Sequence, residues 1–284
     1  MIWHSDIGSL RQPLMVMALN GMFDAGKAAT NAATWIRDHC ENELVGELDP
    51  EELYNFSESR PLVTFDDSGD REIRWPTVRF YGCRTDGGRD VLVAVGSEPQ
   101  YKWKWFSGTV LSLARQSGCG MVVTLGSALA MTPHTRPARI VASSGDPTLA
   151  ARLQLRSPSY EGPTGVVGVV NQHLEAESFP IMSLRAEVPH YVPGSPSPKS
   201  TQSLLRRLEQ LTRIPTRYEE LDGAVHAWIE QVDAAVAADE ESRVYLAQLE
   251  HRVDADEERL PSGDDVAGEL EAYLRELGSG GDDT

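Results

Sequence analysis

The chain has 284 residues, 40% of them hydrophobic, which is enough for one large α/β domain with a sizeable core. Its net charge of −17 argues against a nucleic-acid partner, because neutralising phosphates needs a basic surface. The sequence contains no run of about 18 apolar residues, so we expect no transmembrane helix and no membrane partner.

Cysteine usage and the N-terminus indicate a cytoplasmic protein. Cys40, Cys83 and Cys119 are odd in number and far apart, which is typical of reduced, buried thiols. The N-terminus has no basic segment followed by an apolar one, so no secretory signal is expected. The histidines show no HxxxH or HExxH spacing, and no Walker loop or GxSxG motif is present, so we expect no metal and no cofactor.

The first 217 residues alternate short apolar runs with helical patterns. This alternation predicts βαβ units around a parallel or mixed sheet that is covered on both faces. Ser197, followed by Pro198, is predicted to cap the last of these helices. The predicted strands are 14–19, 91–95, 121–125, 138–145 and 181–188, and the predicted helices are 25–39, 103–118 and 198–213.

The C-terminal region has a different character. Residues 219–284 hold 20 acidic residues against four arginines, a net charge of −16, so the first 218 residues carry only −1. Apolar residues at helical spacing predict an acidic, all-helical region over 218–284 beside an α/β body over 1–217. These residues are Leu221, Val225, Trp228 and Val232, then Val244 and Leu249, and another helix is predicted over 264–277, before a frayed end.

Polar residues follow several predicted strands. In open α/β sheets ligands bind at the carboxyl ends of strands, so we expect these side chains to meet at one edge. The residues are Asp24, Glu98, His134, Arg136 and His190, together with Glu161.

Several of these residues also have a purely structural interpretation. Asp24 is either a site residue or the N-cap of the Ala-rich helix. Glu98, ahead of several aromatics, could have a raised pKa and act as an acid or base, or the aromatics could be the buried face of a helix. His134 and Arg136, on a proline-bounded loop, could bind a carboxylate or phosphate or brace a subunit contact.

The stretch "SYEGPTGVVGVV", residues 159–170, places three glycines three residues apart. Its spacing fits neither a phosphate loop nor a dinucleotide fingerprint. Thr164 could cap a helix whose N–H groups attract anions, whereas Glu161, beside Tyr160, would suit a hydroxyl, amine or cation. The alternative is a turn that lets a helix approach the sheet closely.

Several segments, in order, give the chain a family resemblance. Over residues 13–211 it resembles the proteasome assembly chaperone superfamily, and most of all its actinobacterial branch, named after the second eukaryotic assembly chaperone. The segments are "NGMFDAGKAA", "GELDPEELYNFSESRP", "GSEPQYKWKWF", "LGSALAMTPHTRP", "SYEGPTGVVGVV" and "VPHYVPGSPSPKS". The resemblance implies a three-layer α/β/α sandwich similar to the nucleoside phosphorylase and hydrolase fold, and it supplies no catalytic residues.

Two functions are therefore open. The first is an oligomeric interaction or assembly-chaperone-like protein, with a trimer expected from trimeric phosphorylase-like folds and with the acidic helices available to protein partners. The second is a binder or enzyme for a nucleoside-like or anionic metabolite at the sheet edge, where α/β sites form.

Overall fold

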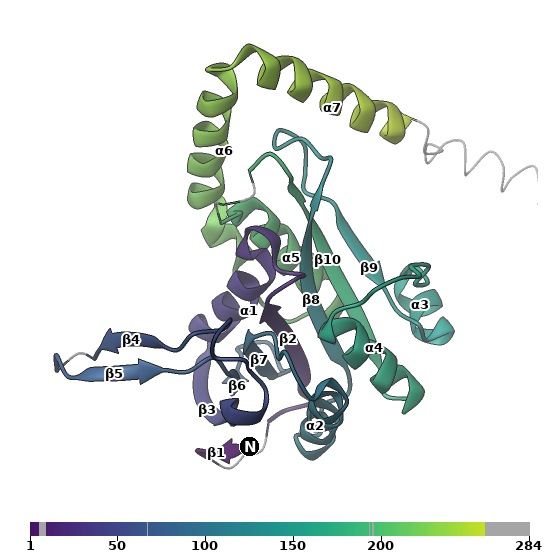
Figure 1. Cartoon of the computed structure of the whole chain (residues 1–284). Helices are drawn as coiled ribbons and strands as arrows, with labels where there is room; N and C mark the ends of the chain where they lie inside the picture. Colours follow the sequence, from purple (N-terminus) through teal and green to yellow (C-terminus); the bar gives the residue numbers. More distant parts are fainter. Residues whose placement is uncertain (6–9, 67, 193, 195, 259–284) are drawn as a thin grey trace, which may run out of the picture. The chain divides into compact units, whose positions relative to one another are not determined.

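The computed structural model describes residues 1–5, 10–66, 68–192, 194 and 196–258, and its centre is an eight-stranded mixed sheet. The strands are β1 Ile2–Trp3, β2 Leu14–Asn20, β3 Glu41–Glu47, β6 Val78–Arg84, β7 Val91–Ser97, β8 Val122–Ala130, β9 Ile140–Ser143 and β10 Ile181–Pro189. They lie in the order β1-β3-β6-β7-β2-β8-β10-β9 (Figure 1). β7, β2, β8 and β10 are parallel, and every other neighbouring pair is antiparallel.

β2 runs through the middle of the sheet and divides its side chains between two cores. Leu14, Val16 and Ala18 are buried in the first core, and the residues that alternate with them are buried in the second. A parallel strand buried on both faces is a continuous apolar run, which is why the sequence predicted this strand.

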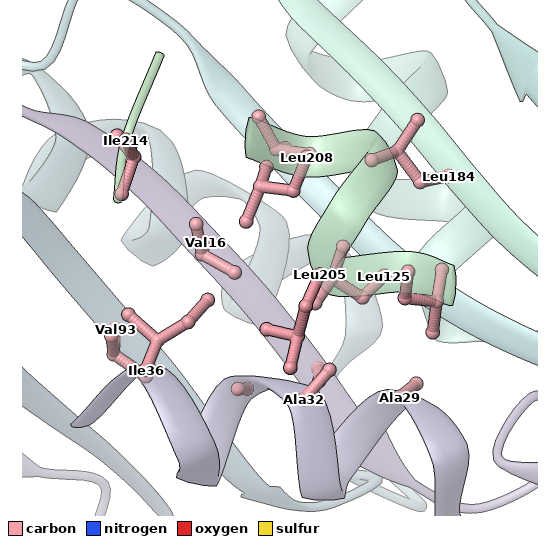
Figure 2. Packing of buried hydrophobic residues seen from close by; sticks show 14 of the residues in the cluster. Val16, Ala29, Ala32, Ile36, Val93, Leu125, Leu184, Leu205, Leu208 and Ile214 are labelled. Carbon is pink, nitrogen blue, oxygen red and sulfur yellow. The ribbon is translucent and has the colours of Figure 1, made fainter. Parts of the chain in front are cut away.

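Helices cover both faces of the sheet and make a three-layer α/β/α sandwich. α1 (Ala28–Asp38) and α5 (Pro198–Thr212) pack on the first core, where Figure 2 shows Ala29 and Ala32 below Leu205. α2 (Trp103–Gln116) and α4 (Val166–Ala176) pack on the second. The α/β prediction is confirmed, and the further likeness to the nucleoside phosphorylase fold stays a prediction.

The helix starts follow from local chemistry. α5 begins as predicted, with the Ser197 hydroxyl accepting from the Ser200 N–H and Pro198 as its first residue. Gly26, at φ 58°, is the point where the backbone before α1 passes α5, because a Cβ there would lie 3.0 Å from the Ser197 Cβ. The carbonyl of this glycine accepts from the Ser197 N–H at 2.8 Å.

Several elements were not predicted. β3 and β6 pair antiparallel, and their sequences "ENELVGE" and "VRFYGCR" mix charged residues with apolar ones. A strand that is polar on one side gives a weaker signal than the apolar runs of the parallel strands. The other additions are the short helix α3 (Pro147–Leu153), the edge strand β1 and a separate two-stranded sheet of β4 (Leu62–Phe65) and β5 (Arg71–Arg74).

The chain divides into two compact units, Met1–Val232 and Asp233–Thr284. A 3₁₀ turn over Tyr218–Leu221 leads into α6 (Asp222–Ala237), and α7 spans Glu240–Glu258. The first part of the acidic region is therefore helical, as predicted, and the helix expected over 264–277 lies outside the described residues. Among the described helices, none is long and apolar enough to cross a membrane.

A truncation separates the two parts of the acidic region. A chain that ends at Ala238 should keep the stability of the first unit, because it retains the buried side chains of Leu221, Trp228 and Val232. A chain that ends at Arg217 loses all three and should be less stable by at least about 3–5 kcal/mol, the range for removing one large buried aromatic. Urea unfolding followed by circular dichroism measures both, and equal stability of the two chains would contradict this assignment.

Candidate functional site

Glu98 follows β7 directly and joins two distant backbone segments. Its Oε2 accepts a hydrogen bond from the Met22 N–H at 2.8 Å, and its Oε1 accepts from the Val166 N–H at 3.2 Å. Met22 lies in the loop after β2, and Val166 is the first residue of α4. One half-buried carboxylate therefore holds the loop after the central strand against the start of a helix.

Two glycines make room for this carboxylate. A Cβ on Gly21 would lie 2.0 Å from the Glu98 Oε2, and a Cβ on Gly165 would lie 3.0 Å from its Oε1. The second would also lie 3.3 Å from the ring of Phe23. The stretch "SYEGPTGVVGVV" therefore contains a turn that lets a helix approach the sheet closely, one of the two alternatives for it.

The prediction that Thr164 caps α4 is wrong. The N-cap is Gly165, with no hydrogen bond from a capping side chain of its own, and the Thr164 hydroxyl lies 3.4 Å from the Gly165 carbonyl instead. Free N–H groups at a helix start favour negative charge, and here an anion from the chain itself takes that place. The anion is the carboxylate of Glu98, which comes from another element and carries no local sequence signal.

Asp24 caps α1. Its Oδ1 accepts from the N–H groups of Ala29 and Thr30, each at 3.0 Å, and its Oδ2 accepts from the Thr30 hydroxyl at 2.5 Å. Burial raises the pKa of the Asp24 carboxyl, and the hydrogen bonds from Thr30 and Ala29 act in the opposite direction. The structure therefore gives Asp24 the capping contacts that were its structural alternative.

His134 belongs to a second group of polar residues, after β8 and β10. It is fully buried, its backbone N–H donates to the Tyr191 hydroxyl at 2.7 Å, and its Nδ1 lies 2.7 Å from the same oxygen. Lys199 Nζ donates to the carbonyl oxygens of His134 and Arg136, the second at 2.5 Å. The Trp228 ring stands edge-on to the imidazole, with centroids 6.4 Å apart. This group braces the loop after β8 against α5 and α6.

Of the remaining candidates, His190 and Arg136 adjoin this group, and Tyr160 and Glu161 lie outside it. His190 is bonded to β8 through its N–H and its Nδ1, each 3.2 Å from the Ala130 carbonyl oxygen. Tyr160 and Glu161 are exposed, and the Tyr160 hydroxyl donates to the Pro163 carbonyl at 3.0 Å. Arg136 is held in the loop through its backbone carbonyl.

The structure thus places six of the eight candidates in two groups on the carboxyl edge, and Tyr160 and Glu161 are exposed outside both. Asp24, Glu98 and Thr164 surround the ends of β2 and β7. His134, Arg136 and His190 follow β8 and β10, and β8 continues to Ala130, three residues beyond the bridge between Asp24 and Ser127.

Sequence reasoning missed three residues that organise this edge. They are Tyr191, Lys199 and Ser127, the last of which donates from its hydroxyl to the Ala25 carbonyl at 2.8 Å. Each is an ordinary polar residue in or beside a predicted element, and only its partner, distant in the sequence, reveals the contact.

A cleft of 630 Å³ lies at the other edge, beside the amino ends of β2 and β7. Its lining includes three arginines, each with a carboxylate partner: Arg11 with Asp90 at 2.8 Å, Arg84 with Glu41 at 3.7 Å and Arg217 with Asp86 at 3.2 Å. None of the residues predicted from the sequence lines this cleft.

The two hydrogen bonds of Glu98 predict that replacing one carboxylate oxygen by an amide nitrogen destabilises the folded protein. In Glu98→Gln a single oxygen must serve two N–H groups, and the amide NH₂ faces one of them. We expect the free energy of unfolding to fall by about 1–3 kcal/mol, the cost of one unsatisfied donor. Urea denaturation measures this, with the exposed Glu161→Gln as a matched control that should change nothing. A Glu98→Gln protein as stable as the control would contradict the bridging role.

The buried Asp24 predicts a pH dependence. Because its folded pKa lies above the unfolded value of about 3.9, the folded state binds the proton more tightly, and stability falls as pH rises through that interval. Asp24→Asn keeps an oxygen for the two N–H groups and removes the titration. Its stability relative to the wild type should therefore increase from pH 3.5 to pH 6, by roughly 1.4 kcal/mol per unit of pKa difference. Unfolding curves across this range test the slope, and Glu161→Gln should follow the wild type throughout.

Comparison with known proteins places the chain in a family. The model of the PAC2 family matches residues 18–236. No curated protein matches the sequence. A PAC2 family protein from Streptomyces avermitilis is 38% identical, with a TM-score of 0.76, over 82% of this chain and 99% of that one.

Two further structures extend the comparison. A proteasome-assembly chaperone homologue from Mycobacterium tuberculosis is 33% identical, with a TM-score of 0.74, over 82% of this chain and 99% of that one. Pyrococcus furiosus PbaB, an archaeal proteasome activator, is 14% identical with a TM-score of 0.64 over 83% and 97%, a likeness of fold alone. The match over most of the sequence, together with the two relatives above 30% identity, shows that this chain belongs to the PAC2 family.

Proposed function

We propose that the protein is an oligomeric, assembly-chaperone-like interaction protein that catalyses no reaction of its own. The observation that carries this proposal is the use of the carboxylates at the carboxyl edge of the sheet. Both oxygens of Glu98 and both oxygens of Asp24 accept hydrogen bonds from the chain itself. A general acid or base must reach a substrate proton, and these groups are instead occupied in holding two helix starts.

The relatives support the same direction. The 33% identical protein of M. tuberculosis is described as a proteasome-assembly chaperone homologue, which favours a role in binding other proteins. Exposed apolar side chains favour self-association, because large uncovered apolar groups mark interaction surfaces on soluble proteins. They include Met22, Phe65, Trp105 and Tyr160. A homo-oligomer, with a trimer as the first expectation, covers such groups.

The acidic helices and the thiols complete the proposal. The acidic region from residue 218 offers a negatively charged surface to basic segments of protein partners. Cys40, Cys83 and Cys119 are free thiols, which suits the reducing conditions of the cytoplasm.

A thermal-shift screen with nucleosides, nucleobases and inorganic phosphate distinguishes this function from metabolite binding. A ligand at 100 times its dissociation constant stabilises by about 2.7 kcal/mol, which raises the melting temperature of a protein of this size by several degrees. We expect shifts below about 1 °C for every compound. A reproducible shift of about 5 °C or more with any one compound would favour the metabolite-binding alternative, and light scattering on the same samples reports the oligomer independently.

A further inference from the structure

β4 and β5 form a two-stranded ribbon, residues 62–74, that is separate from the main sheet and projects from the body (Figure 1). Its register places Val63 opposite Ile73 and Phe65 opposite Arg71, so these side chains share one face of the ribbon. Trp75, directly after β5, continues the same alternation and meets the Phe56 ring at 4.9 Å.

This face of the ribbon is uncovered and mainly apolar, with Arg71 as the one charged residue on it. The exposed fractions are 50% for Val63, 69% for Phe65, 54% for Ile73 and 41% for Trp75. An isolated two-stranded ribbon is marginally stable in water, and an apolar face on such a ribbon needs something to pack against.

The opposite face is built for solvent. Glu72 accepts a hydrogen bond from the Thr64 hydroxyl at 3.0 Å and pairs with Arg74 at 2.6 Å. Leu62 is the exception on this face, with 65% of its surface exposed. The ribbon is therefore amphipathic: one face carries paired polar side chains, and the other is apolar apart from Arg71.

A second uncovered surface lies around the start of α2. We name it the α2 face, and it consists of Tyr101, Lys104 and Trp105, with Met22 on the neighbouring loop. Tyr101, Trp105 and Met22 are exposed apolar residues. The Met22 N–H is bonded to Glu98, three residues before Tyr101, which joins the two segments.

The charges of the ribbon turn and the α2 face are complementary, and Arg71 is the one positive residue on the apolar face of the ribbon. The ribbon turn carries the exposed carboxylates of Asp66 and Asp70. α2 begins without a capping side chain and without an acidic residue in its first turn, so its N-terminus is positive. Lys102 pairs with Glu52 at 2.6 Å, whereas Lys104 has no ion pair within the described part of the chain.

From these observations we propose that the apolar face of the ribbon docks on the α2 face of a second copy of this chain, with the acidic turn beside Lys104. This rests on the proposed self-association and names the surfaces that produce it. The occupant is a second copy because one chain carries both uncovered apolar surfaces and both signs of charge. The contact is heterologous, with a different surface on each side, so successive copies form a ring when the rotation closes.

Charge placed on the ribbon tests the contact, with light scattering after size-exclusion chromatography as the measurement. Phe65→Lys and Ile73→Lys each put a charge in the proposed interface, and the particle mass should fall toward that of one 31.2 kDa chain. Leu62→Lys puts the same charge at an equally exposed position on the opposite face and should leave the mass unchanged. Circular dichroism of all three proteins should match the wild type.

A charge exchange and a cross-link identify the partner surface. Lys104→Glu should weaken the oligomer at least tenfold in dissociation constant, and Asp70→Lys in the same chain should restore most of the loss. When Phe65→Cys and Trp105→Cys proteins are mixed, a thiol-reactive bridging reagent should join residue 65 of one chain to residue 105 of another, as peptide mass spectrometry would show.

Each contrary outcome overturns a defined part of the proposal. An oligomer that keeps its mass in Phe65→Lys and Ile73→Lys overturns the ribbon contact and leaves self-association in place. A monomeric wild type overturns both, whatever the ligand screen finds. Loss of mass in Leu62→Lys, or cross-links from residue 65 to any surface other than the α2 face, overturns the docking geometry.

Discussion

The carboxylate of Glu98 satisfies two backbone N–H groups that the fold would otherwise leave without partners, one in the loop after β2 and one at the start of α4. Helix starts always expose such donors, and in a closely packed edge water cannot reach all of them. The contact fixes where α4 approaches the sheet, and α4 in turn packs with α2 over the second core. The Glu98 carboxylate thus positions the end of β7, the loop after β2 and the start of α4 relative to one another. Gly21 and Gly165 lie beside it because a side chain at either position would collide with it.

This use of charge explains why an edge that resembles a binding site is largely self-contained. In parallel α/β sheets the carboxyl edge gathers loops and helix starts, and their free N–H groups attract an anion. Here Glu98 and Asp24 fill that role from within the chain. The second polar group, around His134, joins the longer ends of β8 and β10 through Tyr191 and contacts α5 through Lys199 and α6 through Trp228. Outside these contacts, the apolar side chains that remain exposed are available to bind other protein surfaces.

The parallel half of the sheet could be predicted because each of its strands is buried on both faces, so that "LMVMAL" and "VLVAV" stand out as apolar runs. β3 and β6 could not be predicted in this way, because charged residues interrupt their apolar pattern and they pair antiparallel with each other. The site residues were recognised by their position after strands, which is a local signal. Their roles depend on partners far along the chain, such as Val166 for Glu98, and no spacing within the sequence encodes such a pair.

The strand order has a consequence for how the chain reaches its native state. β2 is made before both of its neighbours in the sheet, β7 and β8, and the sheet beyond β8 waits for β10. Contacts between such distant segments slow folding, because the loops between them must close before any pairing stabilises the sheet. During synthesis the apolar strand from Leu14 to Leu19 therefore stays unpaired until residues beyond 97 have emerged. An apolar strand that stays unpaired in this way is prone to aggregation during synthesis, which is the hazard that general folding factors limit.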